Sequence, residues 1–101
     1  MAEKLPTKQD CNTIETVYTN HRSVKVAVTL QVSDQCVADG ILDVYDKAGS
    51  SPIQTVIVPA GHEVTEKVNV PSRGRIELNC DGSHGPGSHC SVLVLDEVEI
   101  P

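Results

Sequence analysis

The stretch from Cys80 to Cys90, which reads CDGSHGPGSHC, holds the residue types of this chain that are best suited to chemistry. Two cysteines enclose a loop rich in glycine and histidine. Together they supply four thiol or imidazole groups: Cys80, His84, His89 and Cys90. Thiolates and imidazoles bind zinc and iron, and two neighbouring thiols can form a disulfide. The loop is therefore a candidate metal site, redox centre or disulfide-closed turn.

An iron–sulfur cluster would need four ligands from the protein. The residues from Cys80 to His84 resemble the signature of the CDGSH iron–sulfur domains, which use three cysteines and the final histidine. Two of those cysteines form a C-x-C pair just upstream in that family. Here the nearest upstream cysteine is Cys36, and Leu78 occupies the position that is usually proline. The ligand set is incomplete, so we predict no cluster and no other cofactor.

A structural zinc site would use the same four groups of the loop. Zinc ligands are usually spaced as C-x2–4-C and H-x3–5-H pairs, whereas His89 and Cys90 are adjacent. Catalysis by a cysteine–histidine pair lacks both a group that orients the base and an oxyanion donor. Zinc binding by the loop is therefore an alternative interpretation, and we predict no enzymatic activity.

A hairpin is the interpretation that we favour for this loop. Cys80 continues the alternation of Ile76 and Leu78, and Cys90 is in phase with Val92 and Val94. If the two strands pair, the cysteines lie opposite each other across the loop. A disulfide there would stabilise the fold by roughly 2–3 kcal/mol in the chain-entropy view.

Composition and charge exclude several classes of partner. The 101 residues carry a net charge of −6 and include no Phe or Trp. An acidic chain is poorly suited to a phosphate backbone, and single-stranded nucleic acid needs aromatic side chains for stacking. No apolar run reaches about 18 residues, so we expect no membrane insertion. The polar start, MAEKLPTKQDCNT, lacks the apolar segment of a secretory signal.

Valine-rich segments with alternating apolar and polar residues make up most of the chain, as is typical of half-buried strands. The longest alternation places on one face Val24, Val26, Val28, Leu30 and Val32. Turn signals recur about every 8–12 residues and no helical pattern occurs. We therefore predict an all-β fold, a single jelly-roll-like β-sandwich of about eight strands. The expected strands span residues 13–19, 23–33, 41–46, 53–58, 62–70, 75–79 and 90–100.

Residues 1–12 are polar and show no period, so we predict a flexible N-terminal connector there and the sandwich domain at 13–101. The connector carries Cys11, and a turn-rich break carries Cys36. We expect disulfides, within or between subunits, at Cys11, Cys36, Cys80 and Cys90. Four cysteines allow three intramolecular pairings, and intermolecular ones besides. A cysteine-bearing arm also suits head-to-tail contacts, which leave one interface open and grow filaments.

This layout resembles the major subunits of bacterial endospore appendages, which are spore pili built from jelly-roll subunits. The matching pieces are KQDCNTIE (8–15), VIVPAGHEVTEKVNV (56–70), RIELNC (75–80) and HCSVLVL (89–95). Many members carry paired cysteines in the connector, whereas this chain has one.

The resemblance implies a structural subunit whose partner is a further copy of itself. It implies that Cys11 reaches across to a cysteine on another subunit, with Cys80 or Cys90 as the acceptor. It also implies strand-edge contacts between subunits and a location on the spore surface, reached when the mother cell lyses. Two alternatives remain: a monomeric sandwich module that binds a ligand through its loops, and a zinc-binding domain that uses the Cys80–Cys90 loop.

Overall fold

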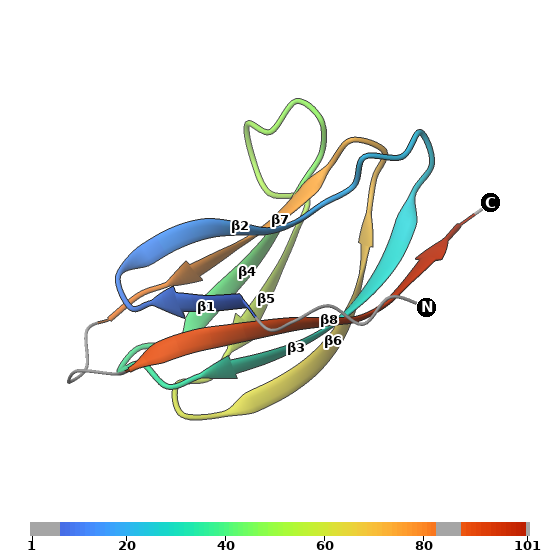
Figure 1. The fold of residues 1–101 in the computed structure, drawn as a ribbon. Helices are drawn as coiled ribbons and strands as arrows, with labels where there is room; N and C mark the ends of the chain where they lie inside the picture. Colours follow the sequence, from blue (N-terminus) through green and yellow to red (C-terminus); the bar gives the residue numbers. More distant parts are fainter. Residues whose placement is uncertain (1–6, 83–87, 101) are drawn as a thin grey trace.

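The computed structural model of this protein describes residues 7–82 and 88–100. That part of the chain forms eight strands and no helix (Figure 1). The strands are β1 (Thr7–Asp10), β2 (Thr13–Thr19), β3 (Val26–Asp34), β4 (Gly40–Tyr45), β5 (Gln54–Val58), β6 (Glu63–Val70), β7 (Arg75–Cys80) and β8 (His89–Glu99). No helix in the described residues is long and apolar enough to cross a membrane.

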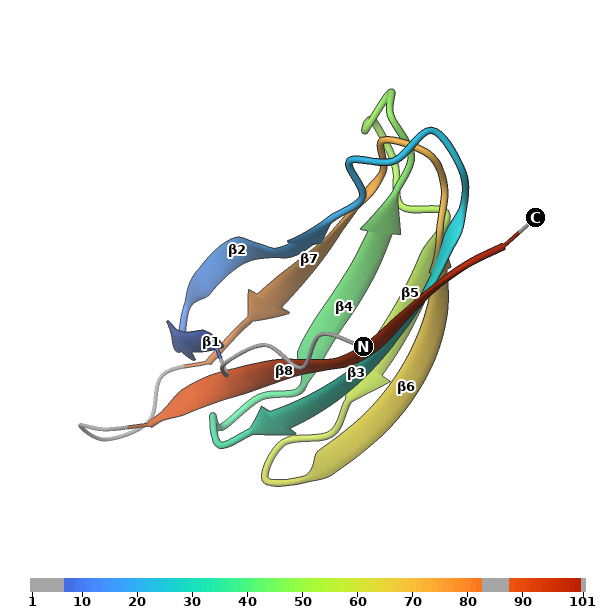
Figure 2. The ribbon, with the colours of Figure 1, turned by 45° about the vertical axis from the view of Figure 1, so that its right-hand side comes forward.

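Two four-stranded antiparallel sheets form a sandwich (Figure 2). One sheet has the order β1-β8-β3-β6 and the other β2-β7-β4-β5. Only β4 and β5 are consecutive strands of the same sheet, and every other connection carries the chain from one sheet to the other. This arrangement confirms the predicted all-β, jelly-roll-like sandwich.

The core consists of the inward faces of both sheets. From Val28 to the end of β3 buried and half-buried residues alternate, as expected for a strand with one face in the core, and Val28, Leu30 and Val32 are fully buried. Opposite them, β4 and β7 contribute Leu42 and Leu78. Apart from Ala27, the buried apolar residues belong to one continuous cluster, so a single core holds the two sheets together.

The alternation predicted for residues 23–33 begins three residues later than expected. Val24 lies outside β3 and is 38% exposed. Asn20, which is buried, explains the difference because its Nδ2 donates hydrogen bonds to the carbonyls of Val24, Val70 and Pro71. The amide holds the chain in a turn where the alternation alone predicts a strand.

Part of the predicted connector also differs from the expectation. Residues 1–6 lie outside the described part of the chain, but Thr7–Asp10 forms β1 and pairs with β8 at an edge of its sheet. The sequence TKQD has no apolar alternation, so local pattern does not signal this strand.

Tyr18 joins the two sheets through a polar contact. It lies on β2, is 6% exposed, and its hydroxyl donates a hydrogen bond of 2.8 Å to Glu97 Oε1 on β8. Burial raises the pKa of Tyr18 above its ordinary value, and the bond to the Glu97 carboxylate raises it further. The folded chain therefore holds this proton more tightly than the unfolded chain does.

We expect the free energy of unfolding to fall as the pH rises through about 10, where an unfolded tyrosine ionises while folded Tyr18 keeps its proton. Tyr18→Phe removes this contribution, so its stability should fall less steeply over the same pH range. Tyr45→Phe is the control, because it removes the other tyrosine and leaves Tyr18 in place. Denaturant unfolding at a series of pH values measures the slopes, and equal slopes for Tyr18→Phe and wild type would contradict the expectation.

Candidate functional site

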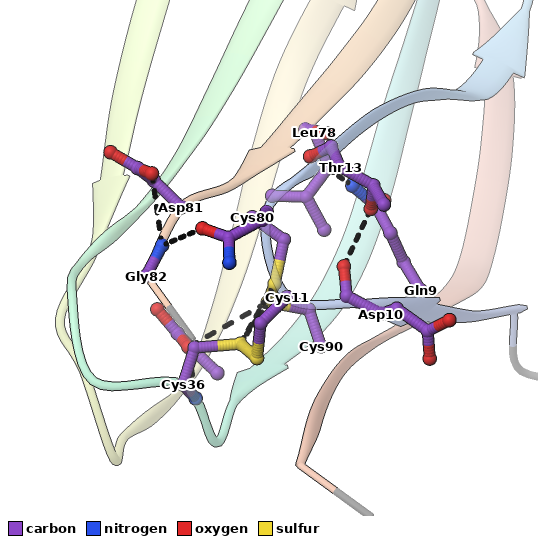
Figure 3. The surroundings of a disulfide bond; sticks show 12 residues. Gln9, Asp10, Cys11, Thr13, Cys36, Leu78, Cys80, Asp81, Gly82 and Cys90 are labelled. Atoms are coloured by element: carbon purple, nitrogen blue, oxygen red, sulfur yellow. Dashed lines mark hydrogen bonds between the residues drawn. A yellow bond between two sulfur atoms is a disulfide. The ribbon is translucent and has the colours of Figure 1, made fainter. Parts of the chain in front are cut away.

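All four cysteines meet at one end of the sandwich, in two disulfides (Figure 3). Cys11, directly after β1, is joined to Cys36 in the connection between β3 and β4. Cys80 ends β7 and is joined to Cys90 near the start of β8. We call these four residues the sulfur cluster.

The two disulfides contact each other. Cys36 Sγ lies 2.9 Å from Cys80 Sγ and 3.8 Å from Cys90 Sγ. Cys80 and Cys90 are fully buried, and Cys36 is 5% exposed. Such proximity means that a thiolate formed at any member of the cluster would have other sulfurs within reach for disulfide exchange.

Asp34 is buried beside the sulfur cluster at the end of β3. Its Oδ1 accepts a hydrogen bond of 2.8 Å from the Cys36 amide and lies 3.6 Å from Cys90 Sγ. Its Oδ2 has no hydrogen-bond partner among the described residues. Burial raises the pKa of the Asp34 carboxyl, because the charged form loses its contact with water.

Gln9 anchors β1 to the other sheet. Its side chain is buried, and Nε2 donates hydrogen bonds of 2.9 Å to the Thr13 carbonyl and 2.8 Å to the Leu78 carbonyl. Asn12, between β1 and β2, has a positive φ of 68° and donates its backbone N–H to the Cys80 carbonyl. The position of Cys11 is therefore set by neighbours on both sides of it in sequence.

The predicted hairpin between the strands that carry Cys80 and Cys90 is wrong. β7 pairs with β2 and β4, whereas β8 pairs with β1 and β3, so the two strands lie in different sheets. The structure still joins Cys80 to Cys90, and this disulfide bridges the sandwich instead of closing a hairpin. Alternation within each strand is the same in both arrangements, so it cannot tell them apart.

The metal ligands considered from sequence are not the ones that the structure gathers. His84 lies outside the described residues, and His89 is half-buried at the start of β8. The described groups that converge are instead Asp34, Cys36, Cys80 and Cys90, whose ligating atoms all lie within 4.8 Å of one another. Sequence reasoning overlooked Asp34 and Gln9. Asp34 stands two residues before Cys36 in the sequence. This spacing indicates that Asp34 lies near the sulfurs only once Cys36 is known to be buried among them.

A second candidate surface lies on the outer face and edge of the β2-β7-β4-β5 sheet. The exposed isoleucines Ile14 on β2 and Ile57 on β5 stand in the same row across this face, since both are in register with the pair Ile41 and Asn79 on the inner strands. β5 is an edge strand without a charged residue. Uncharged edges are the ones most open to pairing with another strand.

No protein-family model matches this chain, and none of the curated proteins matches its sequence. Among solved structures, one from the Bacillus endospore appendages, described as a novel family of disulfide-linked pili, aligns with 99% of this chain and 88% of its own, with a TM-score of 0.64. The identity is 10%, so the likeness establishes a shared fold. The fold expected from the sequence is thus the fold that this chain shares with that subunit.

Removing the Cys80–Cys90 disulfide should lower the free energy of unfolding by about 3 kcal/mol, given the loop that it closes. The variant is Cys80→Ala with Cys90→Ala, which keeps the Cys11–Cys36 bond. Removing that other bond by the corresponding double change should cost about 0.8 kcal/mol more, because its loop is longer. Equilibrium denaturation without reductant measures both values, and wild-type stability in either variant would contradict the expectation.

Proposed function

We propose that this chain is a structural, non-enzymatic subunit that self-assembles into disulfide-cross-linked fibres, such as spore appendages. The fibres are extracellular or lie on the spore surface, exposed after the mother cell lyses. The fold that the chain shares with a subunit of disulfide-linked pili supports this proposal. The observation that carries it is the place of Cys11, directly after an edge strand and within a cluster of exchangeable sulfurs.

Exchange between subunits follows from this arrangement. The thiolate of Cys11 in one copy attacks Cys36 Sγ in a second copy. The Cys11–Cys36 bond within the second copy breaks, and its Cys11 leaves as a thiolate that attacks a third copy. The number of disulfides is unchanged, so propagation needs no external oxidant, and one reduced chain starts it.

The same exchange moves β1 between subunits. Among the described strands β1 pairs with β8 alone, at the sheet edge, and Asn12 is the single residue between Cys11 and β2. A neighbour's β1 could take the same place along β8 and make the same contacts, as in domain swapping. Because each copy gives its β1 to one neighbour and accepts it from another, the contact does not close and a filament grows. In this scheme Cys36 is the acceptor, and Cys80 and Cys90 lie next to it.

Lateral contacts would use the uncharged edge of β5. Backbone groups on this edge are available for pairing with a strand of another subunit, and Ile57, which is 51% exposed, adds apolar area beside them. The strand β6, at the edge of the other sheet, is charged by contrast, and its exposed positions include Glu63 and Lys67. Charges of this kind usually block edge pairing, so we assign the lateral contact to β5.

Purified protein boiled in detergent without reductant should give a ladder of covalent multimers that collapses to the monomer with reductant. Cys11→Ser should give a folded monomer and remove the ladder, because it deletes the attacking thiolate. Circular dichroism checks that the variant is folded. A monomer in both lanes for wild type would favour the monomeric binding module, and a ladder or boiling-resistant fibres in Cys11→Ser would exclude Cys11 as the link.

Ile57→Lys should reduce fibre length and number, because it places a charge on the β5 edge. The matched control is Thr65→Lys, which adds the same positive charge at an exposed position of the β6 edge. Electron microscopy of assembled samples counts the fibres, and gels show whether covalent linkage persists. Normal fibres in Ile57→Lys, or equal losses in both variants, would contradict the assignment of the lateral contact to β5.

A further inference from the structure

We propose that the fully reduced chain binds one zinc ion through Cys36, Cys80, Cys90 and Asp34. This site differs from the zinc site considered in the Cys80–Cys90 loop, since Asp34 and Cys36 take the places of the two histidines. It does not depend on fibre formation, because it concerns the reduced monomer.

The spacing of the ligand atoms suits a tetrahedral ion. Two sulfurs that are each about 2.3 Å from a zinc ion lie about 3.8 Å apart in a tetrahedron, and a sulfur and an oxygen lie about 3.5 Å apart. Cys36 Sγ and Cys90 Sγ are separated by 3.8 Å, and Asp34 Oδ1 lies 3.6 Å from Cys90 Sγ. Cys80 Sγ, now bonded to Cys90 and 2.9 Å from Cys36 Sγ, has to move away from both sulfurs once the disulfide is opened. The four groups thus need one local adjustment and no change of fold.

The backbone already holds these ligands at strand ends from both sheets. Asp34 ends β3, Cys80 ends β7, and Cys90 is the second residue of β8. The Cys36 amide donates a hydrogen bond to Asp34 Oδ1, which orients the carboxylate toward the sulfurs as an outer-shell partner does in metal sites.

Asp34 provides the strongest argument that a cation belongs here. It is 1% exposed, the backbone amides of Cys36 and Gly40 are its polar neighbours, and Oδ2 has no hydrogen bond of good geometry from the described residues. A buried carboxylate without a full set of partners is costly, and a divalent cation beside it removes that cost. Three thiolates with one carboxylate favour zinc over magnesium or calcium, which prefer oxygen ligands alone.

The chemistry balances as follows. A phosphine reductant opens each disulfide with one molecule of water, giving two thiols and the phosphine oxide. Four thiols result from the two disulfides. Zinc then binds three of them as thiolates and releases three protons to solvent, while Asp34 binds as the carboxylate. Cys11 remains a free thiol. Zinc does not change oxidation state in any step.

The test uses the full chain, reduced with a phosphine under nitrogen and folded with and without zinc. Competition against a chromophoric chelator measures stoichiometry and affinity, and cobalt in place of zinc gives a thiolate-to-metal absorption band. We expect one ion per chain, three protons released per ion, and a higher melting temperature with zinc. The oxidised protein should bind none.

Asp34→Asn should weaken zinc binding at least about 10-fold and alter the cobalt spectrum, and Cys36→Ser should weaken it further. Cys11→Ser is the matched control, because it removes a cysteine of the same cluster that is not a ligand, and it should bind zinc as wild type does. If a variant fails to fold, the number of protons released and the thiolate-to-metal band of the reduced wild type still test whether the chain binds one ion through three thiolates. No stoichiometric ion in the reduced wild type, or unchanged affinity in both Asp34→Asn and Cys36→Ser, would overturn the site.

Cys11→Ser also separates this site from the proposed function. It is expected to lose covalent multimers and to keep zinc binding, so each proposal fails on a different measurement. Multimers without zinc binding would leave the fibre subunit and remove the metal site. Zinc binding by a chain that never forms multimers would keep the metal site and remove the fibre subunit.

Discussion

The disulfide between Cys80 and Cys90 is the constraint on which this end of the structure depends, because it ties β7 in one sheet to β8 in the other. The core between the sheets has no Phe or Trp and relies on valine, leucine and isoleucine, which bury less area per side chain. Cross-links that restrict the unfolded chain add stability that a core of small side chains does not supply by itself.

Buried polar side chains secure what the core leaves open. Gln9 binds the carbonyls of Thr13 and Leu78 next to the sulfur cluster, and Asn20 binds three carbonyls at the far end of β2. Strand pairing ends where the chain crosses from one sheet to the other. At these places the side-chain amides of Gln9 and Asn20 donate the hydrogen bonds that a neighbouring strand would otherwise supply. Satisfying these carbonyls is necessary because a buried acceptor without a partner is costly.

The same atoms support both roles assigned to the sulfur cluster. A thiolate needs a disulfide close by for exchange, and a zinc ion needs several sulfurs within one coordination shell. The 2.9 Å and 3.8 Å contacts of Cys36 Sγ meet both requirements. The redox state of the cysteines selects between disulfide exchange and zinc binding, since sulfurs paired in disulfides cannot act as thiolate ligands. A chain made in a reducing compartment and released into an oxidising one would pass from the reduced, zinc-binding state to the disulfide-bonded state.

The sequence by itself determined the all-β class and the position of most strands: β2 was predicted at its full extent, and β4 to β8 to within a residue at each end. Period-two alternation is a local property of the sequence, so it identifies a strand without knowledge of the partner strand. Tertiary structure alone decided that β7 and β8 lie in different sheets, that TKQD is a strand, and that Asp34 and Cys36 lie beside Cys80 and Cys90. Each of these depends on which chain segments pack together across the core, and alternation along one segment carries no information about that.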